Sequence, residues 1–400
     1  MNDIHNPRVV VAGHICLDII PAFKTGSAPS MAELFVPGRL INMGRVTVST
    51  GGPVSNTGIA LTIMGIDTQL MGKIGADFFG DGILSQLKQR QIDSGMRIAD
   101  GEDTSYTVTI VPPGFDRIFL HNPGANNSFR ANDVDYEAVG RADLFHFGYP
   151  PLMRGMFENG GLELMTMFRN VKESGVTTAL DMSLPDADSE SGQLDWESLL
   201  TSVLPFVDIY LPSIEETLFM LDRCAYKDLR DQAVGGDPLE HLDVDILPAL
   251  GDKLLALGAK IAVIKCGVKG YYIRTSDINS LRNMGKVTPP ESWASRELYE
   301  QSFHVPDIAS ATGSGDSSIA GFLASLLRGK SIEESIRVAC AVGGCNLTAY
   351  DALSGIKPWE ETLALIPGWE KNRFPVSGRY WRHDERKDVW IGKKDYQYGV

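Results

Sequence analysis

Short apolar runs alternate with helix-forming segments over much of this 400-residue chain, and this alternation constrains its fold more than any other feature. Residues 8–13 form a continuous apolar run closed by glycine, as expected for a strand buried on both faces. We predict further strands at residues 143–147, 176–181, 207–211 and 261–265, and helices at residues 152–174, 195–204, 213–222 and 246–257. Such alternation specifies an α/β fold with a mostly parallel, helix-covered sheet.

Residues 19–50 and 104–121 interrupt this alternation with a different pattern. The first stretch carries several prolines and then alternating apolar residues, so we expect extended β structure there and no helix. Apolar residues alternate again on both sides of a turn at Pro113, which predicts a hairpin over residues 106–120. We expect this hairpin to pair with residues 35–50 and to form a small β lid outside the main sheet.

The segment 308–329 joins a glycine-rich loop to an amphipathic helix. From Ile319 onward, apolar residues recur at i, i+3, i+4, i+7 and i+8, so we expect a helix that begins near Gly315 or Asp316. Gly313 and Gly315 leave the backbone almost bare, so several N–H groups can point at one ligand at the positive end of the helix dipole. The segment therefore predicts an anion-binding site.

Asp316 stands among these amides, where its carboxylate would repel a bound phosphate. Two interpretations are open. Asp316 can be the general base for a hydroxyl that attacks a phosphoryl group. It can also be a helix N-cap that accepts hydrogen bonds from the first N–H groups of the helix.

This loop and helix resemble the second signature of the ribokinase-like (PfkB-type) carbohydrate kinases, which reads Asp-Thr-x-Gly-Ala-Gly-Asp before a helix. The last five positions of that signature are matched by Thr312, Gly313, Ser314, Gly315 and Asp316, with Ser in place of Ala. The resemblance implies that Gly313, Ser314 and Gly315 form an anion hole for the transferred phosphate and that Asp316 is the base. Ser310 replaces the first Asp of the signature, so the tethering of the loop and a neighbouring monovalent-cation site are both left open.

The resemblance extends to the expected acceptor site. Asp18 matches the sugar-binding Asp after the first strand, and the Gly-Gly-x-x-x-Asn motif is matched by Gly51, Gly52 and Asn56. The first signature of the family is matched by Gly72, Gly75, Asp77 and Gly80. The resemblance implies that Asp18 and Asn56 bind acceptor hydroxyls while Gly51 and Gly52 lie against the acceptor. Arg117, on the predicted hairpin, points either into this pocket or to solvent.

Further stretches resemble the nucleotide-binding part of the family. A strand turn that borders the nucleotide is matched by Lys265, Gly267 and Gly270, and Asn346 matches a position near the adenine pocket. Glu216 matches the Glu of an Asn-x-x-Glu motif concerned with Mg²⁺ and phosphate, although Ser213 replaces the Asn. Each match has an ordinary alternative, because helix dipoles favour Glu in a first turn and helices carry polar residues such as Asn346.

Composition narrows the range of partners. The net charge of −14, without a basic cluster, argues against nucleic acid. No run approaches eighteen apolar residues and the N-terminal residues lack a signal-peptide pattern, so we expect a soluble, cytoplasmic protein with no membrane partner. The five cysteines form no C-x-x-C pair, which favours buried thiols over zinc ligands.

We expect residues 1–400 to form a single domain with the ribokinase-like three-layer αβα sandwich that the resemblance implies. Residues 223–245 and 275–302 are polar and irregular, so we interpret them as surface insertions. Residues 371–400 mix aromatic and charged side chains, and we expect this C-terminal extension to dock on the body or on a second subunit, as in a homodimer.

The resemblance implies an ATP- and Mg²⁺-dependent kinase that phosphorylates a hydroxymethyl group on a small sugar or sugar acid. Two other functions stay open. A nucleoside kinase of the same architecture would use the same Asp316 and a different acceptor pocket. A non-catalytic sugar-binding or regulatory protein is suggested by Ser310 and Ser213, but the retention of Asp316 between its glycines argues against it.

Overall fold

The strand β1 (Arg8–Gly13) lies inside a large sheet and sends its side chains alternately to two cores. The computed structural model describes residues 6–24, 31–92, 95–112, 118–233 and 237–398. Val9 and Val11 belong to one buried apolar cluster, whereas Val10 and Ala12 belong to another. This period of two explains why the strand is a continuous apolar run, since neither face of the sheet meets solvent.

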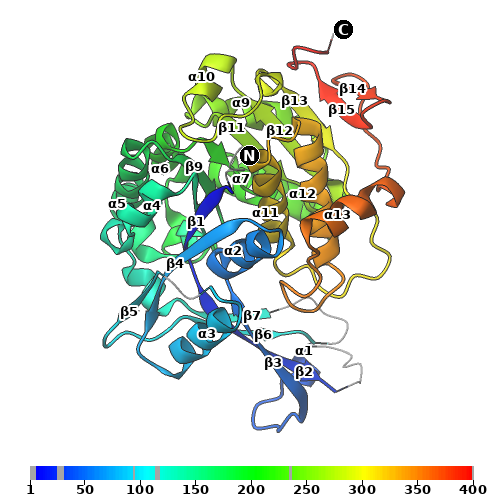
Figure 1. The fold of residues 1–400 in the computed structure, drawn as a ribbon. Helices are drawn as coiled ribbons and strands as arrows, with labels where there is room; N and C mark the ends of the chain where they lie inside the picture. Colours follow the sequence, from blue (N-terminus) through cyan, green and yellow to red (C-terminus); the bar gives the residue numbers. More distant parts are fainter. Residues whose placement is uncertain (1–5, 25–30, 93–94, 113–117, 234–236, 399–400) are drawn as a thin grey trace.

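The described residues form an 11-stranded sheet in the order β14-β15-β13-β12-β11-β10-β9-β8-β1-β4-β5 (Figure 1). These strands are β4 (Asp67–Gly75), β5 (Met96–Ala99), β8 (Leu144–Gly148), β9 (Thr177–Asp181), β10 (Ile209–Tyr210), β11 (Ile261–Lys265), β12 (Tyr271–Thr275), β13 (Glu297–Glu300), β14 (Trp381–Asp384) and β15 (Val389–Gly392). Neighbouring strands pair in parallel in the part of the sheet that runs β11-β10-β9-β8-β1-β4-β5. They pair antiparallel in the part that runs β14-β15-β13-β12-β11. The predicted α/β fold with a mostly parallel sheet is confirmed.

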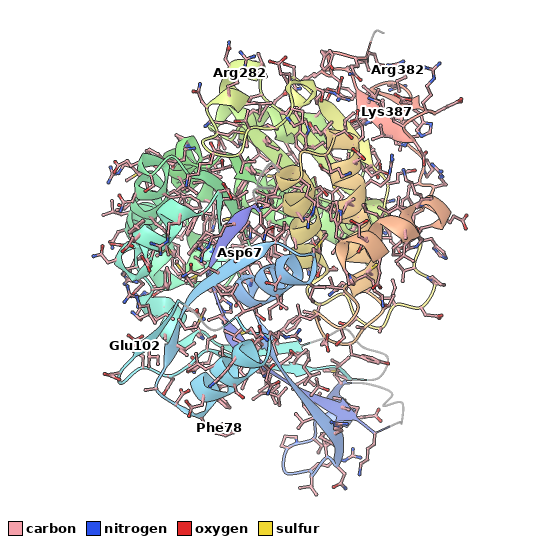
Figure 2. All side chains as sticks on the ribbon, in the orientation of Figure 1. Asp67, Phe78, Glu102, Arg282, Arg382 and Lys387 are labelled. Carbon is pink, nitrogen blue, oxygen red and sulfur yellow. The ribbon has the colours of Figure 1, made fainter. Side chains whose placement is uncertain are left out.

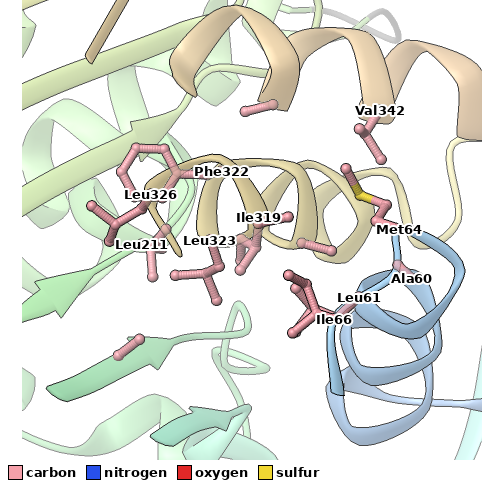
Figure 3. Close-up of a cluster of buried hydrophobic side chains, with 14 of the residues drawn as sticks. Ala60, Leu61, Met64, Ile66, Leu211, Ile319, Phe322, Leu323, Leu326 and Val342 are labelled. Atoms are coloured by element: carbon pink, nitrogen blue, oxygen red, sulfur yellow. The ribbon is translucent and has the colours of Figure 1, made fainter. Parts of the chain in front are cut away.

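Helices cover both faces of this sheet. One face is packed by α2 (Pro53–Ile63), α11 (Ser314–Leu327) and α12 (Ile332–Asn346), and Figure 3 shows Ile319, Phe322 and Leu323 of α11 in the same cluster as Ala60 and Leu61 of α2. The other face is packed by α5 (Arg154–Glu173), α6 (Trp196–Val203), α7 (Ile214–Leu221) and α9 (Leu247–Ala256). The remaining α-helices are α1 (Met31–Leu34), α3 (Phe78–Gln89), α4 (Tyr136–Arg141), α8 (Arg223–Gln232), α10 (Ile278–Arg282) and α13 (Trp359–Leu365). No helix in the described ranges has the length and apolar character needed to cross a membrane.

A second sheet lies below the main body in Figure 1 and forms the lid. Its order is β3 (Met43–Gly51), β2 (Cys16–Phe23), β6 (Tyr106–Ile110) and β7 (Ile118–Asn122). The predicted β6–β7 hairpin is present, but it pairs in parallel with β2 and not with residues 35–50. The short helix α1 contradicts the expectation that residues 19–50 lack a helix. Arg117 lies outside the described residues.

One of the two segments that we expected as surface insertions is part of the packed body. Residues 275–302 contain β13, a fully buried strand of the main sheet, whereas residues 223–245 contain the helix α8, which is mostly exposed. The extension 371–400 docks on the body, because β14 and β15 form a C-terminal hairpin that pairs with β13 (Figure 1). For residues 275–302 polar composition was misleading, because charged side chains such as Glu300 are buried with distant charged partners.

Arg296 provides the clearest of these pairs. Its side chain is 1 % exposed, and its guanidinium contacts Asp395 of the extension and Glu333 of α12, each at 2.8 Å. A buried charge that loses a partner is left without the water that would otherwise solvate it. The C-terminal hairpin is therefore tied to the core by electrostatics as well as by strand pairing.

We expect Asp395→Ala to lower the free energy of unfolding by about 3 kcal/mol, because it leaves the buried Arg296 short of one partner. Arg282→Ala is the matched control, since it breaks the exposed pair with Glu291 on the surface of α10 (Figure 2) and should cost at most about 1 kcal/mol. Urea unfolding measures both. Equal costs for the two variants would show that the extension does not stabilise the body.

Candidate active site

Asp316 is held by groups from two other elements rather than by its own helix. The N-cap of α11 is Gly313, with φ of 76°, and no side chain caps this helix. The Asp316 carboxylate instead accepts a hydrogen bond from Asn56 Nδ2 at 2.9 Å and from the Tyr149 hydroxyl at 3.0 and 3.1 Å. The N-cap interpretation of Asp316 is therefore wrong.

Burial changes the proton affinity of Asp316. The residue is 2 % exposed, and this burial raises the pKa of its carboxyl group. The hydrogen bonds from Asn56 and Tyr149 and the charge of Lys265 oppose that shift and favour the ionised form. In its ionised form, a carboxylate at a helix N-terminus can accept a proton from a neighbouring hydroxyl, and a raised pKa makes it a stronger base.

The loop before α11 has the backbone shape that an anion site needs. A side chain at Gly313 would meet Ala352 at 2.4 Å, and the positive φ also requires glycine. The Ser314 N–H donates to the Ala311 carbonyl at 3.3 Å, so this amide has a partner within the loop. We had expected it to bind the anion instead. The amides of Gly315 and Asp316 are then the ones available at the positive end of the helix.

Ser310 keeps a tether that its replacement of Asp had put in question. Its hydroxyl accepts a hydrogen bond from the Thr312 N–H at 3.1 Å. The loop is therefore closed by a neutral side chain where the family signature has a carboxylate.

The lid brings Asp18 to the same region. A Cβ at Gly51 would lie 2.2 Å from Asp18 Oδ2, and a Cβ at Gly52 would lie 2.5 Å from the His14 carbonyl oxygen, so only glycines allow this approach. The charge of Asp316 contributes to the raised pKa of Asp18, which indicates that the two carboxylates share one site. The structure thus groups Asp18, Gly51, Gly52 and Asn56 around Asp316, as the sequence predicted.

The surroundings of Asp18 disfavour the ionised form of its carboxyl group. Burial raises the pKa of its carboxyl group to about 6, although hydrogen bonds from Cys16 and Thr107 oppose the shift and Asp316 adds to it. The Cys16 Sγ donates to Asp18 Oδ1 at 3.3 Å, and the Thr107 hydroxyl reaches Cys16 at 3.6 Å. These contacts join β2 to β6 behind the carboxylate.

Sequence analysis missed His14, His121 and Tyr149 on the acceptor side. His14 is 2 % exposed, and neither of its ring nitrogens has a hydrogen-bond partner in the described part of the chain; the same holds for Asn56 Oδ1. The His14 ring centre lies 5.2 Å from that of His121 and 6.3 Å from that of Tyr149. A positional signal did exist, because His14 and Tyr149 directly follow β1 and β8, at the sheet edge where α/β proteins bind ligands.

Lys265 lies on the other side of the loop. Its ammonium group contacts Asp181 at 2.5 Å and donates to the Leu211 carbonyl at 2.6 Å, while its Cε lies 3.7 Å from where a Gly315 Cβ would be. Burial lowers the pKa of Lys265, but the charges of Asp181 and Glu216 raise it more, so the net shift is upward. A fixed positive charge therefore faces the anion loop, and Asp181 is a further residue that the sequence did not single out.

Glu216 is committed to its own helix. It forms a capping box with Ser213, in which the Ser213 N–H donates to Glu216 Oε2 at 2.6 Å and the Glu216 N–H donates to Ser213 Oγ at 3.1 Å. No group of three potential metal-ligating side chains occurs within the described ranges. Mg²⁺ needs only one or two carboxylates besides water and phosphate, so the remaining oxygen of Glu216 fits such a site through water.

The other predicted nucleotide residues lie on two further segments. Gly267 and Gly270 flank the turn between β11 and β12 at positive φ, and a Cβ at Gly270 would meet the Glu300 carbonyl at 2.0 Å. Asn346, buried at the end of α12, donates to the Ala352 carbonyl at 2.7 Å, and its Oδ1 has no partner among the residues that the structure describes. No hydrogen bond in the described ranges joins these three residues to Asp316.

Comparison with known proteins identifies a family. A family model described as "pfkB family carbohydrate kinase" matches residues 7–359. A sugar kinase of Archaeoglobus fulgidus is 22% identical over 299 residues, which are 74% of this chain and 98% of that protein. Fructokinase-1 of Zea mays is 25% identical over 370 residues, which are 90% of this chain and 97% of that protein.

A solved structure shares the fold. The crystal structure of fructokinase with bound ATP from Xylella fastidiosa superposes with a TM-score of 0.65 at 17% sequence identity, and the match covers 91% of this chain and 99% of that one. The likeness confirms the ribokinase-like three-layer fold with a β lid that the sequence predicted.

The raised pKa of Asp18 predicts a pH-dependent stability effect. Between the usual value of 3.8 and about 6, the folded protein keeps a proton that the unfolded chain has lost, so stability falls as pH rises through this window. Asp18→Asn removes the ionisable group. We expect the variant to be more stable than the wild type by about 1–3 kcal/mol above pH 6, with a smaller difference towards pH 4.

Urea unfolding of both proteins at several pH values measures this difference. Asp67→Asn is the control, because Asp67 is exposed on the surface and pairs weakly with Arg8 at 3.6 Å (Figure 2). A stability difference for Asp18→Asn that does not change with pH would contradict the burial argument.

Proposed function

Because the chain belongs to the pfkB family of carbohydrate kinases, we propose that it transfers the γ-phosphate of ATP to a hydroxymethyl group of a small sugar or sugar acid. One observation carries the proposal. The buried Asp316 carboxylate lies beside the amides at the start of α11 and contacts Asn56, with Asp18 in the same site. A base and an anion-binding backbone at one point are what direct phosphoryl transfer to an alcohol requires.

The acceptor binds on the lid side of Asp316. Asn56 Oδ1 and the His14 ring are buried without hydrogen-bond partners among the described residues, and the Asp18 carboxylate shares the site with Asp316. A ligand with several hydroxyl groups supplies such donors, and an unpaired buried polar group favours the ligand that satisfies it. This donor requirement supports an acceptor with several hydroxyl groups, such as a sugar.

Asp316 takes the proton of the acceptor hydroxyl as the alcohol oxygen bonds to Pγ and the bond from Pγ to the departing ADP oxygen breaks. The Gly315 and Asp316 amides, at the positive end of α11, bind the oxygens of the transferred group. Lys265 adds a positive charge next to this loop. Glu216 would hold Mg²⁺ through water, and the bound ion would neutralise charge on the phosphates.

The lid contributes residues to the site and so couples binding to closure. Asp18 lies on β2 and Thr107 on β6, both strands of the lid sheet. A sugar that bonds to Asp18 therefore holds the lid against the body, and water is excluded from Asp316. Without such exclusion, water would compete with the sugar for the phosphoryl group.

Asp316→Asn should keep the fold and ATP binding but reduce turnover by about 10²–10⁴, because the general base is lost. Asp307→Asn makes the same chemical change at an exposed position in the preceding segment and should leave turnover unchanged. The assay is acceptor-dependent ADP release with ribose, fructose, 2-keto-3-deoxygluconate, adenosine and inosine.

The outcomes of this panel separate the alternatives. Activity with the sugars alone supports the proposal, whereas activity with adenosine or inosine alone identifies a nucleoside kinase. If none of the five acceptors causes ADP release, the kinase assignment is contradicted and a binding protein is favoured. Near-normal turnover in purified Asp316→Asn would remove this residue from the role of base.

A further inference from the structure

Tyr149 is held in an unusual backbone conformation at the carboxyl end of β8. Its φ of 65° and ψ of 43° are left-handed, which non-glycine residues adopt rarely and at some energetic cost. Its N–H donates to the Asp181 carbonyl at 3.3 Å, and the next two residues are the buried Pro150 and Pro151, which restrict the backbone further. The backbone is therefore restrained, so a displacement of the Tyr149 hydroxyl has to come from rotation of its side chain.

The Tyr149 hydroxyl contacts both oxygens of the Asp316 carboxylate. It lies 3.0 Å from Oδ1 and 3.1 Å from Oδ2, so its single proton is shared between both carboxylate oxygens. Asn56 occupies Oδ2 from the other direction. An acceptor hydroxyl that gives its proton to Asp316 must come within about 2.6–3.2 Å of one of the same oxygens.

We propose that the Tyr149 hydroxyl is a stand-in for the acceptor alcohol, which caps Asp316 in the acceptor-free protein and is displaced when the acceptor binds. This inference rests on the proposed kinase function. It assigns to Tyr149 a positioning role in which the aromatic hydroxyl discriminates between a sugar and water. The sugar displaces the hydroxyl because it also bonds to Asp18 and Asn56, whereas a water molecule has no such additional contacts.

A hydrogen-bond partner for the displaced hydroxyl lies nearby. The His14 ring centre lies 6.3 Å from that of Tyr149, and both His14 ring nitrogens lack a partner within the described residues. One nitrogen can therefore bond the Tyr149 hydroxyl after it leaves Asp316, while the other stays available to the acceptor.

The cap matters because water can replace the alcohol in the reaction. Asp316 would then accept a proton from water, the water oxygen would bond to Pγ, and the bond from Pγ to the ADP oxygen would break, which releases phosphate. A phenol fixed on the base prevents a water molecule from donating to it. The cap thus limits ATP hydrolysis when no sugar is present.

Tyr149→Phe tests the inference because it removes the hydroxyl and keeps the ring. We expect acceptor-independent ADP release to rise about tenfold and the KM for the sugar to fall by a similar factor, since neither water nor sugar has to displace a charge-assisted hydrogen bond. The kcat with saturating sugar should change little. Tyr136→Phe is the matched control, because it removes a hydroxyl bond to the Ala131 carbonyl away from the site and should change neither quantity.

The pH profile separates this role from a merely structural one. In the acceptor-free protein, Asp316 faces Tyr149, Asn56, Lys265, Asp181, Glu216 and Asp18, and the Tyr149 hydrogen bond lowers the pKa of Asp316. Its loss should shift the acid limb of kcat/KM, which reports the free enzyme, to higher pH. The acid limb of kcat should stay in place, because the bound sugar has already displaced the hydroxyl.

The outcomes test the stand-in role of Tyr149 and the kinase function separately. Unchanged hydrolysis and an unchanged or raised KM in Tyr149→Phe would overturn the stand-in role, even when wild-type sugar phosphorylation upholds the kinase function. A large loss of kcat with both limbs unshifted would also overturn it and make Tyr149 a residue that supports the site. Absence of sugar-dependent ADP release in the wild type would instead refute the kinase function itself.

Discussion

The burial of a carboxylate at the start of α11 is the constraint on which the rest of the site depends. Water cannot solvate Asp316 there, so the protein has to supply hydrogen bonds and a nearby positive charge to keep it ionised. Asn56 comes from α2, Tyr149 from the end of β8 and Lys265 from the end of β11. The three elements reach one point because parallel strands end at the same edge of the sheet, where helix N-termini also meet.

This arrangement concentrates negative charge in a dry region. Asp181, Glu216 and Asp316 all influence Lys265, which is the cation that faces the anion loop, and Asp18 adds a further carboxylate with a raised pKa. Such a cluster costs stability in the free protein, because more carboxylates are buried than one lysine can balance. Bound phosphate cannot relieve that repulsion by itself, because it adds further negative charge. The buried carboxylates of the site therefore lower the stability of the fold.

The sequence predicted the sheet because β1 and its neighbours are apolar on both faces, and it predicted Asp316 and Asn56 because they lie at recognisable glycine-rich helix starts. It failed where polarity is compensated by distant partners. Glu300 in β13 is fully buried, yet its partners Arg337 and Lys371 lie far along the chain, so the strand resembled a surface insertion. Tyr149 was missed for a related reason, since an aromatic residue beyond a buried strand reads as core, and only the structure reveals its hydroxyl on Asp316.

The central claim is that one carboxylate at the start of α11 deprotonates an alcohol held between the lid and the body. The most direct test is a crystal structure of the protein with an acceptor sugar, Mg²⁺ and a non-hydrolysable ATP analogue. The account predicts a sugar hydroxyl within about 2.6–3.2 Å of an Asp316 oxygen and in line for attack on Pγ. The Tyr149 hydroxyl should have moved away from Asp316. A sugar bound at a distance from Asp316, or an Asp316 still capped by Tyr149 in that complex, would contradict it.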